Sequence, residues 1–245
     1  MKKILLLIAF YSLFACSAKE QGNTMVMFVE QEQGVEPYQT RMIVTKDFLR
    51  IDDGQDSDSF VLFDRVKKIV YSTNPDDHAI MAVHEKKMPG NKKLEPPIKL
   101  VQTVKEVKDM KDAPEIDGKK PEHYQLSSND KICSDVVAVK GLMPDVVKAL
   151  SEFHELMASD SASTFNNIPP ELYDTCNISK STFTPTRHLK FGFPIHQSDH
   201  DGYTRTLVNF QENYKTDPKL FILPEGFQLY SIKEFREGKV KINRD

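Results

Sequence analysis

Two histidines and two aspartates lie within seven residues in the segment HQSDHDG, residues 196–202. Imidazole nitrogens and carboxylate oxygens at such spacing can bind zinc or a similar ion. His196 and His200 are four residues apart, so they share one face only if the segment is helical. The run Ser-Asp-His-Asp-Gly instead favours a hairpin loop. We therefore expect a loop here and assign no metal ligands, with metal binding by His196 and His200 as the weaker alternative.

Four aspartates lie in a second segment, DDGQDSD, residues 52–58. A calcium-binding loop needs acidic residues at alternate positions, then a glycine and a distal glutamate. Gly54 comes too early for this pattern, so a solvated hairpin loop is expected. The sequence also has no GxSxG, HExxH, GxGxxG or phosphate-binding-loop motif. We therefore predict that the protein is not an enzyme and has neither catalytic residues nor a cofactor.

The first fifteen residues predict a secretory signal. Two lysines precede an apolar run, residues 4–14, that is too short to span a bilayer as a helix. The run ends in LFAC, which resembles the bacterial lipobox, with the cysteine at Cys16. The resemblance implies cleavage before Cys16 and fatty acylation of this residue, and two or more acyl chains anchor a protein stably to a membrane. By the same resemblance, Ser17 favours the outer membrane. A buried N-terminal strand or helix with an incidental cysteine is the alternative.

Two further cysteines, Cys133 and Cys176, remain in the mature chain. In an oxidising periplasm an even pair favours a disulfide. Closing a loop of this length would stabilise the fold by about 4 kcal/mol in the chain-entropy model. Two free thiols are one alternative, since Lys131 could lower the thiol pKa of Cys133. Half of a metal site is another, but no CxxC motif or nearby histidine supports it.

Length and charge narrow the function classes. Loss of residues 1–15 leaves 230 of the 245 residues, enough for a sizeable core. Loss of the two lysines in that segment moves the formal net charge from −3 to −5. No strong basic patch is present, so nucleic acid is not an expected partner. The sequence has no second long apolar run and predicts no transmembrane helix.

The hydrophobic pattern predicts a mainly β fold. Short apolar runs alternate with turn signals about every 8–12 residues, which is typical of antiparallel sheets and barrels. Runs such as FVLF and AIMAV are apolar on both faces, so both faces must be covered. Packing between helices and loops explains this, and a curved sheet holding an apolar ligand is the alternative. Strands are expected at residues 25–30, 38–45, 48–52, 59–64, 69–73, 78–83, 100–111, 122–128, 131–139, 186–193, 203–211 and 220–223.

One clear helix is predicted at residues 143–157, where apolar residues recur at helical spacing on one face. Residues 159–167 are expected to form a loop. A short helix near residues 169–176 would then bring Cys176 back toward Cys133. We therefore predict a signal peptide at residues 1–15, then a single β-rich periplasmic domain over residues 16–245 with a helical insertion at about residues 142–176. The fold class is α+β: a curved antiparallel sheet or unclosed barrel with one or two helices covering one face.

Several segments carry a resemblance to known proteins. RMIVTKDFLRID and SFVLFDRVKKIVYSTNPDDHAIMAV resemble an uncharacterised family of bacterial secreted or lipid-anchored proteins, through residues 50–52, Asp64, Tyr71 and Pro75. ILPEGFQLY resembles that family's closing element, with Phe227 replacing its usual tyrosine. More distantly, the layout is similar to the periplasmic lipoprotein carrier and receptor proteins. This similarity implies an unclosed antiparallel barrel with helices over an apolar cavity.

These observations favour a lipid-anchored binding protein at the periplasmic face of the outer membrane. Its ligand would be a lipid, a lipoprotein acyl group or an apolar peptide held between sheet and helix. The first alternative is an envelope assembly or interaction protein with a filled core, which acts on an envelope protein partner. The weaker alternative is a metal-dependent hydrolase that uses His196 and His200. An apolar cavity of at least ~300 Å³ beneath the helix would favour the first function, and a solid core the second.

Overall fold

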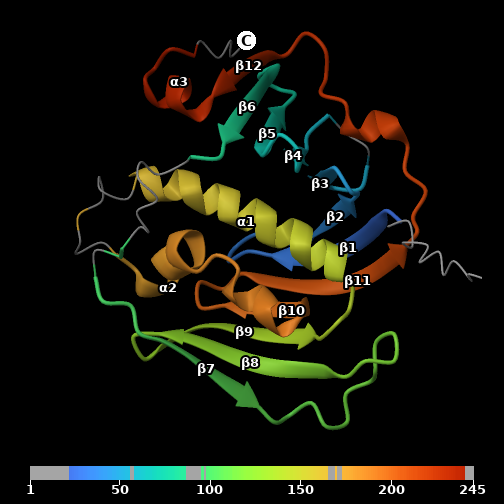
Figure 1. Cartoon of the computed structure of the whole chain (residues 1–245), viewed down its shortest axis with the longest axis vertical. Coiled ribbons are helices and arrows are strands. Elements are labelled where there is room, and N and C mark those ends of the chain that lie inside the picture. Colours follow the sequence, from blue (N-terminus) through green and yellow to red (C-terminus); the bar gives the residue numbers. More distant parts are fainter. Residues whose placement is uncertain are drawn as a thin grey trace, which may run out of the picture.

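Twelve strands form one curved, unclosed sheet around the long helix α1, Pro144–Thr164, in the computed structural model of the chain (Figure 1). The model describes residues 22–55, 58–86, 95–96, 98–164, 169 and 173–240. In the view of Figure 1, α1 lies across the middle of the molecule, with β3–β6 on one side and β8–β10 on the other. The predicted fold class, a curved sheet with helices on one face, is therefore confirmed.

The strands are β1 (Thr24–Gln31), β2 (Tyr38–Val44), β3 (Phe48–Asp52), β4 (Val61–Asp64), β5 (Ile69–Asn74), β6 (Ala79–His84), β7 (Gln102–Val107), β8 (Pro121–Ser128), β9 (Lys131–Val139), β10 (Phe193–Asp199), β11 (Thr204–Glu212) and β12 (Gln228–Ser231). The other helical elements are α2 (Thr175–Ile178), the π-helix η4 (Ser179–Phe183), the 3-10 helices η5 (Arg187–Phe191) and η6 (Pro218–Phe221), and α3 (Ile232–Arg236).

Two antiparallel meanders meet in the middle of the sheet. The strand order is β12-β6-β5-β4-β3-β2-β1-β11-β10-β9-β8-β7, so β1 pairs with β11 and joins the two halves. Of the described strands, β12 alone pairs in parallel, with β6. Strands β9 and β10 are neighbours, and all of α1, α2, η4 and η5 lies between them in the chain. The helices are thus an excursion that leaves the sheet and returns to the adjacent position.

The hairpin between β8 and β9 shows how local sequence sets the register. Asn129 and Asp130 have positive φ values of 48° and 64°. Consecutive positive φ values are typical of the type I′ turn, whose twist matches that of the flanking strands, and Asn is favoured there. The side chain of Asn129 also accepts a hydrogen bond from the Val101 amide at 2.7 Å. The turn predicted at these residues therefore also ties the start of the edge strand β7 to the sheet.

Helix α1 packs its apolar stripe against the concave face of the sheet. Pro144 occupies the first turn, where its missing N–H leaves no bond unmade. The residues it buries include Val146, Leu150 and Leu156, which join one cluster with Phe28, Phe63 and Phe193 of the sheet. Those three rings are each at most 1% exposed. The layer between α1 and the sheet is therefore a packed core.

The helix runs further than the expected end at residue 157. Residues 159–164, predicted to be a loop, continue α1 to Thr164. The sequence there is rich in Ala and Ser and has only a weak helical pattern. The extension of the helix depends on tertiary contacts instead. Asp160 is buried and pairs with Lys86 at 2.6 Å and with Arg236 of α3 at 3.1 Å. These ion pairs hold the last turns of α1 against two other parts of the chain.

Two predicted strands are wrong. Residues 187–191 form η5, and the strand begins at Phe193 instead. The alternation of buried Arg187 and Leu189 resembles a strand, although here it arises in a 3-10 turn. Gly192 ends the turn with a φ of 123°, and a Cβ there would lie 2.4 Å from the Val139 carbonyl oxygen, so only glycine fits. Residues 218–221 likewise form η6, which Asp217 caps by accepting a bond from the Lys219 amide at 2.9 Å.

Within the described residues, no helix is both long and apolar enough to cross a membrane. The predicted signal peptide and Cys16 lie outside the described residues. Their roles stay predictions from the sequence.

Candidate cavity beside the long helix

A cavity of about 730 Å³ opens beside α1, next to the packed core. Its wall combines α1, the segment from η4 to η5, the hairpin between β10 and β11, and residues 32–33. The side chains that matter for its chemistry are His154, Lys180, His188, Gln197, Tyr203 and Arg205. Of the fourteen lining residues, only Met157 and Pro185 carry purely apolar side chains, but apolar atoms contribute rather more of the exposed wall than polar atoms do, so the wall is amphipathic.

Arg205 of β11 is the innermost cation of the cavity wall, with a side chain only 16% exposed. Its guanidinium carbon lies 3.9 Å from the centroid of the Phe28 ring, and such stacking is favourable when the cation is partly desolvated. Its Nε lies 3.3 Å from Glu30, which is directly opposite on β1. One terminal nitrogen contacts the sulfur of Met42 at 3.3 Å. The guanidinium is thus held in a defined plane by the sheet.

Tyr203 and Lys180 complete a polar network around Arg205. The Tyr203 hydroxyl donates to Glu30 at 2.8 Å, and burial raises the pKa of Tyr203 above its usual value, so the phenol stays protonated. The Lys180 ammonium lies 5.2 Å from the centre of the Tyr203 ring and pairs with Asp199. Asp199 also accepts from Gln197 at 2.9 Å. Each of the two cations is therefore anchored on one side by a buried or nearly buried carboxylate.

Two histidine rings from different helices meet in the cavity wall. His154 of α1 and His188 of η5 lie with ring centroids 5.2 Å apart in an edge-to-face arrangement. Burial, followed by the positive charges of Arg205 and Lys180, lowers the pKa of His154 to about 4. Burial also lowers the pKa of His188 well below its usual value, with His154, Lys180 and Arg205 acting in the same direction. Both rings are therefore neutral at pH 7, and each offers one N–H donor and one acceptor nitrogen.

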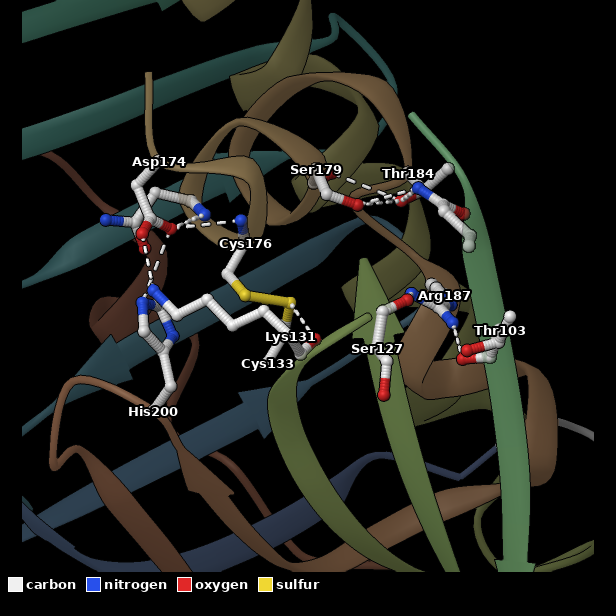
Figure 2. Close-up of a disulfide and its surroundings, with 12 residues drawn as sticks. Thr103, Ser127, Lys131, Cys133, Asp174, Cys176, Ser179, Thr184, Arg187 and His200 are labelled. Carbon is white, nitrogen blue, oxygen red and sulfur yellow. Dashed lines mark hydrogen bonds and ion pairs between the residues drawn. A yellow bond between two sulfur atoms is a disulfide. The ribbon is translucent and has the colours of Figure 1, made fainter. Parts of the chain in front are cut away.

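A disulfide joins the helical excursion to the sheet (Figure 2). Cys133 of β9 pairs with Cys176 of α2, as the sequence predicted. Next to it, Asp174 caps α2 by accepting from the Cys176 amide at 3.0 Å, and it contacts Lys131 at 2.6 Å and His200 at 3.3 Å. Because η4 follows α2 without a break, this cluster fixes the position of Lys180 at the cavity.

His196 and His200 do not share a site. His196 lies in β10, and its Nδ1 is 2.9 Å from the Thr206 hydroxyl. His200 lies in the turn beyond Asp199 and contacts Asp174. Within the described residues, one group of side chains could supply metal ligands by type: Asp174, Cys176 and His200, whose ligand atoms lie within 4.8 Å of one another. The sulfur of Cys176 is bonded in the disulfide, so it offers no thiolate to a metal.

Asp52 is not part of a solvated loop, contrary to expectation. It ends strand β3 and is 7% exposed. Arg41 donates two bonds of 2.8 Å to its carboxylate, and Arg50 donates one of 2.5 Å. Burial alone would raise the pKa of Asp52, but these arginines and the Gly54 amide lower it, so the carboxylate stays charged. Asp52 therefore anchors neighbouring strands of the sheet. Asp56, another aspartate of the same segment, lies outside the described residues.

Sequence reasoning did not select the cavity residues. His154, His188 and Arg205 belong to three elements that are separated in sequence and meet only in the folded chain. One signal was present: His154 follows Phe153 at the border of the apolar face of the predicted helix. A histidine at such a border is positioned to reach a cavity between the helix and its neighbours.

Comparisons with known proteins find similarity in structure but not in sequence families. No protein-family model matches the chain, and no curated protein matches it. An uncharacterized conserved protein from Thermus thermophilus is similar in structure, with a TM-score of 0.43 and 9% identity over 86% of this chain and 91% of that one. Two structures of PNGF-II give a TM-score of 0.41 with 8% and 9% identity over 88% of this chain, which spans 32% of their length. Similarities at this level carry no argument about function.

Proposed function

We propose that the protein is a non-enzymatic, lipid-anchored binding protein of the bacterial envelope that holds a small polar ligand in the cavity beside α1. The observation that carries the proposal is the cavity itself, of about 730 Å³, with polar side chains that converge from several elements. Ligand sites in proteins are concave, usually about 300–1,000 Å³, and contain a few well-placed polar groups. The neighbouring core is packed, so the cavity is a specific feature and not a sign of loose packing.

The polar groups in the cavity wall favour a ligand with polar groups of its own over the acyl chain expected from the sequence. An acyl chain would displace water from Arg205, Gln197 and the two histidines without replacing their hydrogen bonds. Leaving buried polar groups unpaired costs about 1–3 kcal/mol each. A ligand with its own polar groups avoids this cost. The space beneath α1 where an acyl chain would lie is occupied by core side chains.

Membrane anchoring follows from the sequence and is a separate part of the proposal. We expect the mature chain to begin at Cys16, with acyl chains on this residue. Intact-mass spectrometry of the protein extracted from membranes should show loss of residues 1–15 and added hydrocarbon mass. Cys16→Ser should yield a form without that mass, which fractionates away from membranes. A wild-type chain that keeps its first fifteen residues would contradict the anchoring and leave the cavity proposal standing.

Ligand binding can be tested by native mass spectrometry of the protein purified under mild conditions. Ser181 lies at the exposed border of the cavity, so Ser181→Trp should fill its opening and remove the mass of any co-purified ligand. Thr103→Trp, on the exposed edge strand β7, is the matched control and should retain the ligand. Equal retention by both variants would show that the ligand does not occupy the cavity.

A role in envelope assembly is the second candidate, and the open edge of the sheet favours it. Among the described strands, β7 has one neighbour, β8, and it exposes Val104, which is 47% accessible. An edge strand can accept a strand from another protein. The charged Lys105 and Glu106 beside Val104 also discourage unspecific pairing. Crosslinking from position 104 in cells that captures one defined envelope protein, together with an empty cavity in native mass spectra, would favour this candidate over ligand binding.

A further inference from the structure

We infer that the cavity is built for a zwitterionic organic ligand, with its anionic group at Arg205 and its cationic group at the rim between Glu32 and Asp201. The inference rests on the proposed binding function and names the ligand class. Four observations support it: the position of Arg205, the neutral histidine rings, the place of the two rim carboxylates, and the absence of ion-pair partners for these carboxylates in the described chain.

The inner part of the cavity offers hydrogen-bond donors and positive charge. Arg205 is fixed over the Phe28 ring, which leaves its guanidinium oriented without help from a ligand. The nearby rings of His154 and His188 are neutral and can each donate one N–H. Arg205 and Lys180 both line the cavity, whereas their carboxylate partners Glu30 and Asp199 are not among its lining residues. Such a surface favours a carboxylate or a phosphate.

The outer part carries the opposite charge. Glu32 and Asp201 are exposed, and both line the cavity. A second hollow, of about 500 Å³, shares Glu32, Gln33 and Asp201 with the first, so these residues lie at the boundary between the two. The two carboxylates therefore stand at the opening, whereas Arg205 stands inside.

The rim carboxylates have no cationic partner in the described part of the chain. Glu32 accepts a hydrogen bond from the neutral Tyr38 hydroxyl at 2.8 Å. Asp201 accepts from the backbone amide of Tyr203 at 3.2 Å. Neither contact compensates a negative charge, so two carboxylates at one opening favour a cation between them. A ligand with an ammonium group at its outer end supplies that cation.

Two sources of ligand share this chemistry. A short peptide with free ends carries a carboxylate and an ammonium group, and the head group of phosphatidylethanolamine carries a phosphate and an ammonium group. Both fit the stated charge pattern, and the cavity volume accommodates either. The test therefore includes probes of both kinds.

The experiment uses four forms of trialanine that differ only in their ends: both free, N-acetylated, C-amidated, and both blocked. Glycerophosphoethanolamine is the fifth probe. Each is titrated into the mature protein, and chemical-shift changes of His154, His188 and Tyr203 are followed by NMR. We expect the free peptide or glycerophosphoethanolamine to bind best, the N-acetylated peptide less well, and the amidated and fully blocked peptides weakest. The better of the first two probes identifies the source.

Variants assign the two ends of the ligand. Arg205→Gln should lower the affinity for probes with an anionic end by about tenfold or more, because a charge-assisted hydrogen bond is lost. Arg205→Gln should leave the affinity for the C-amidated peptide unchanged. The double variant Glu32→Gln, Asp201→Asn should lower the affinity for the free peptide to that of the wild-type protein for the N-acetylated peptide. Lys190 is exposed and lies outside the cavity, so Lys190→Gln is the control and should leave the affinities for all five probes unchanged.

The outcomes separate this inference from the proposed function. If the blocked or amidated peptide binds as tightly as the free one, the charge assignment is wrong and the cavity is a site for another ligand class. If none of the five probes shifts the cavity resonances, the inference is also wrong, and the Ser181→Trp comparison still decides whether the cavity holds a ligand. Should Arg205→Gln unfold, the rim double variant and the wild-type probe ranking still decide the inference, because neither alters a core contact.

Discussion

Asp52 shows how one carboxylate can organise the middle of a sheet. Its two oxygens accept bonds from Arg41 of β2 and Arg50 of β3. Arg50 continues the chain of contacts, since it donates to the Leu220 carbonyl at 2.6 Å and lies 3.8 Å from the centre of the Phe60 ring. A single buried charge thus connects two strands to the C-terminal segment.

Neutralising this carboxylate should destabilise the fold strongly. Asp52→Asn removes the carboxylate charge that both buried guanidinium groups contact, and removing one partner of such a buried cluster typically costs about 3–5 kcal/mol. The free energy of unfolding, measured by urea denaturation at pH 7, should fall by that order. Asp53→Asn is the matched control, because the neighbouring Asp53 is exposed and, among the described residues, accepts a hydrogen bond from the Gln55 amide. A loss for Asp52→Asn no larger than for Asp53→Asn would show that the cluster is not needed for stability.

At the scale of single elements, the disulfide decides where α2 and η4 lie. Both are short, with four and five residues, and short helices have little stability of their own in water. Their position depends on Cys133 and Cys176, on the capping bonds of Asp174, and on packing against α1. The element that carries Lys180 is therefore held by covalent and polar contacts more than by a core of its own.

Replacing both cysteines by serine should lower the free energy of unfolding by about 2–5 kcal/mol, the usual range for a native disulfide. Amide hydrogen exchange should become faster in residues 175–183 than in β9, because these residues lose their tie to the sheet. Lys131→Gln, which removes one partially exposed ion-pair partner of Asp174, is the control and should cost less than about 1 kcal/mol. Equal effects of the two changes would mean that the ion pairs, and not the disulfide, hold the segment.

At the scale of the whole molecule, the two cavity histidines couple folding to pH. Both have pKa values in the folded state below those of the unfolded chain, with that of His154 lowered from 6.5 to about 4. Between these pH values the unfolded state binds more protons, so the free energy of unfolding decreases as the pH falls from 6.5 toward 4. The protein should therefore be less stable at pH 4.5 than at pH 7.

The contribution of His154 can be isolated by substitution. His154→Gln should remove on the order of 1–2 kcal/mol of the stability difference between pH 7 and pH 4.5, as measured by urea denaturation at both pH values.

His123 provides a contrast of opposite sign. Burial by itself lowers the pKa of His123, but the carboxylates of Asp109 and Asp135 raise it by more, so the net pKa is raised. His123 therefore stabilises the fold below pH 6.5 and loses that effect as the pH rises through its folded pKa. His123→Gln should hence reduce stability mainly at acid pH, and identical pH profiles for both variants would contradict these assignments.

The sequence was sufficient for features that depend on local pattern. Alternating apolar residues and turn signals predicted most strands, including β1 to β6, β8, β9 and β11, because side-chain direction alternates along any strand. Helical spacing predicted α1, and the even cysteine pair predicted the disulfide. The secretory signal and the acylated Cys16 also come from local pattern, and they stay predictions.

Only the tertiary structure decided the features that depend on which distant segments meet. The extension of α1 depends on Lys86 and Arg236, and the burial of Asp52 depends on Arg41 from another strand. The cavity needs side chains from α1, η5 and β11, which the order of the strands brings together. Local periodicity reports the face that a residue occupies on its own element, whereas a site of this kind depends on how elements far apart in the chain are packed against one another.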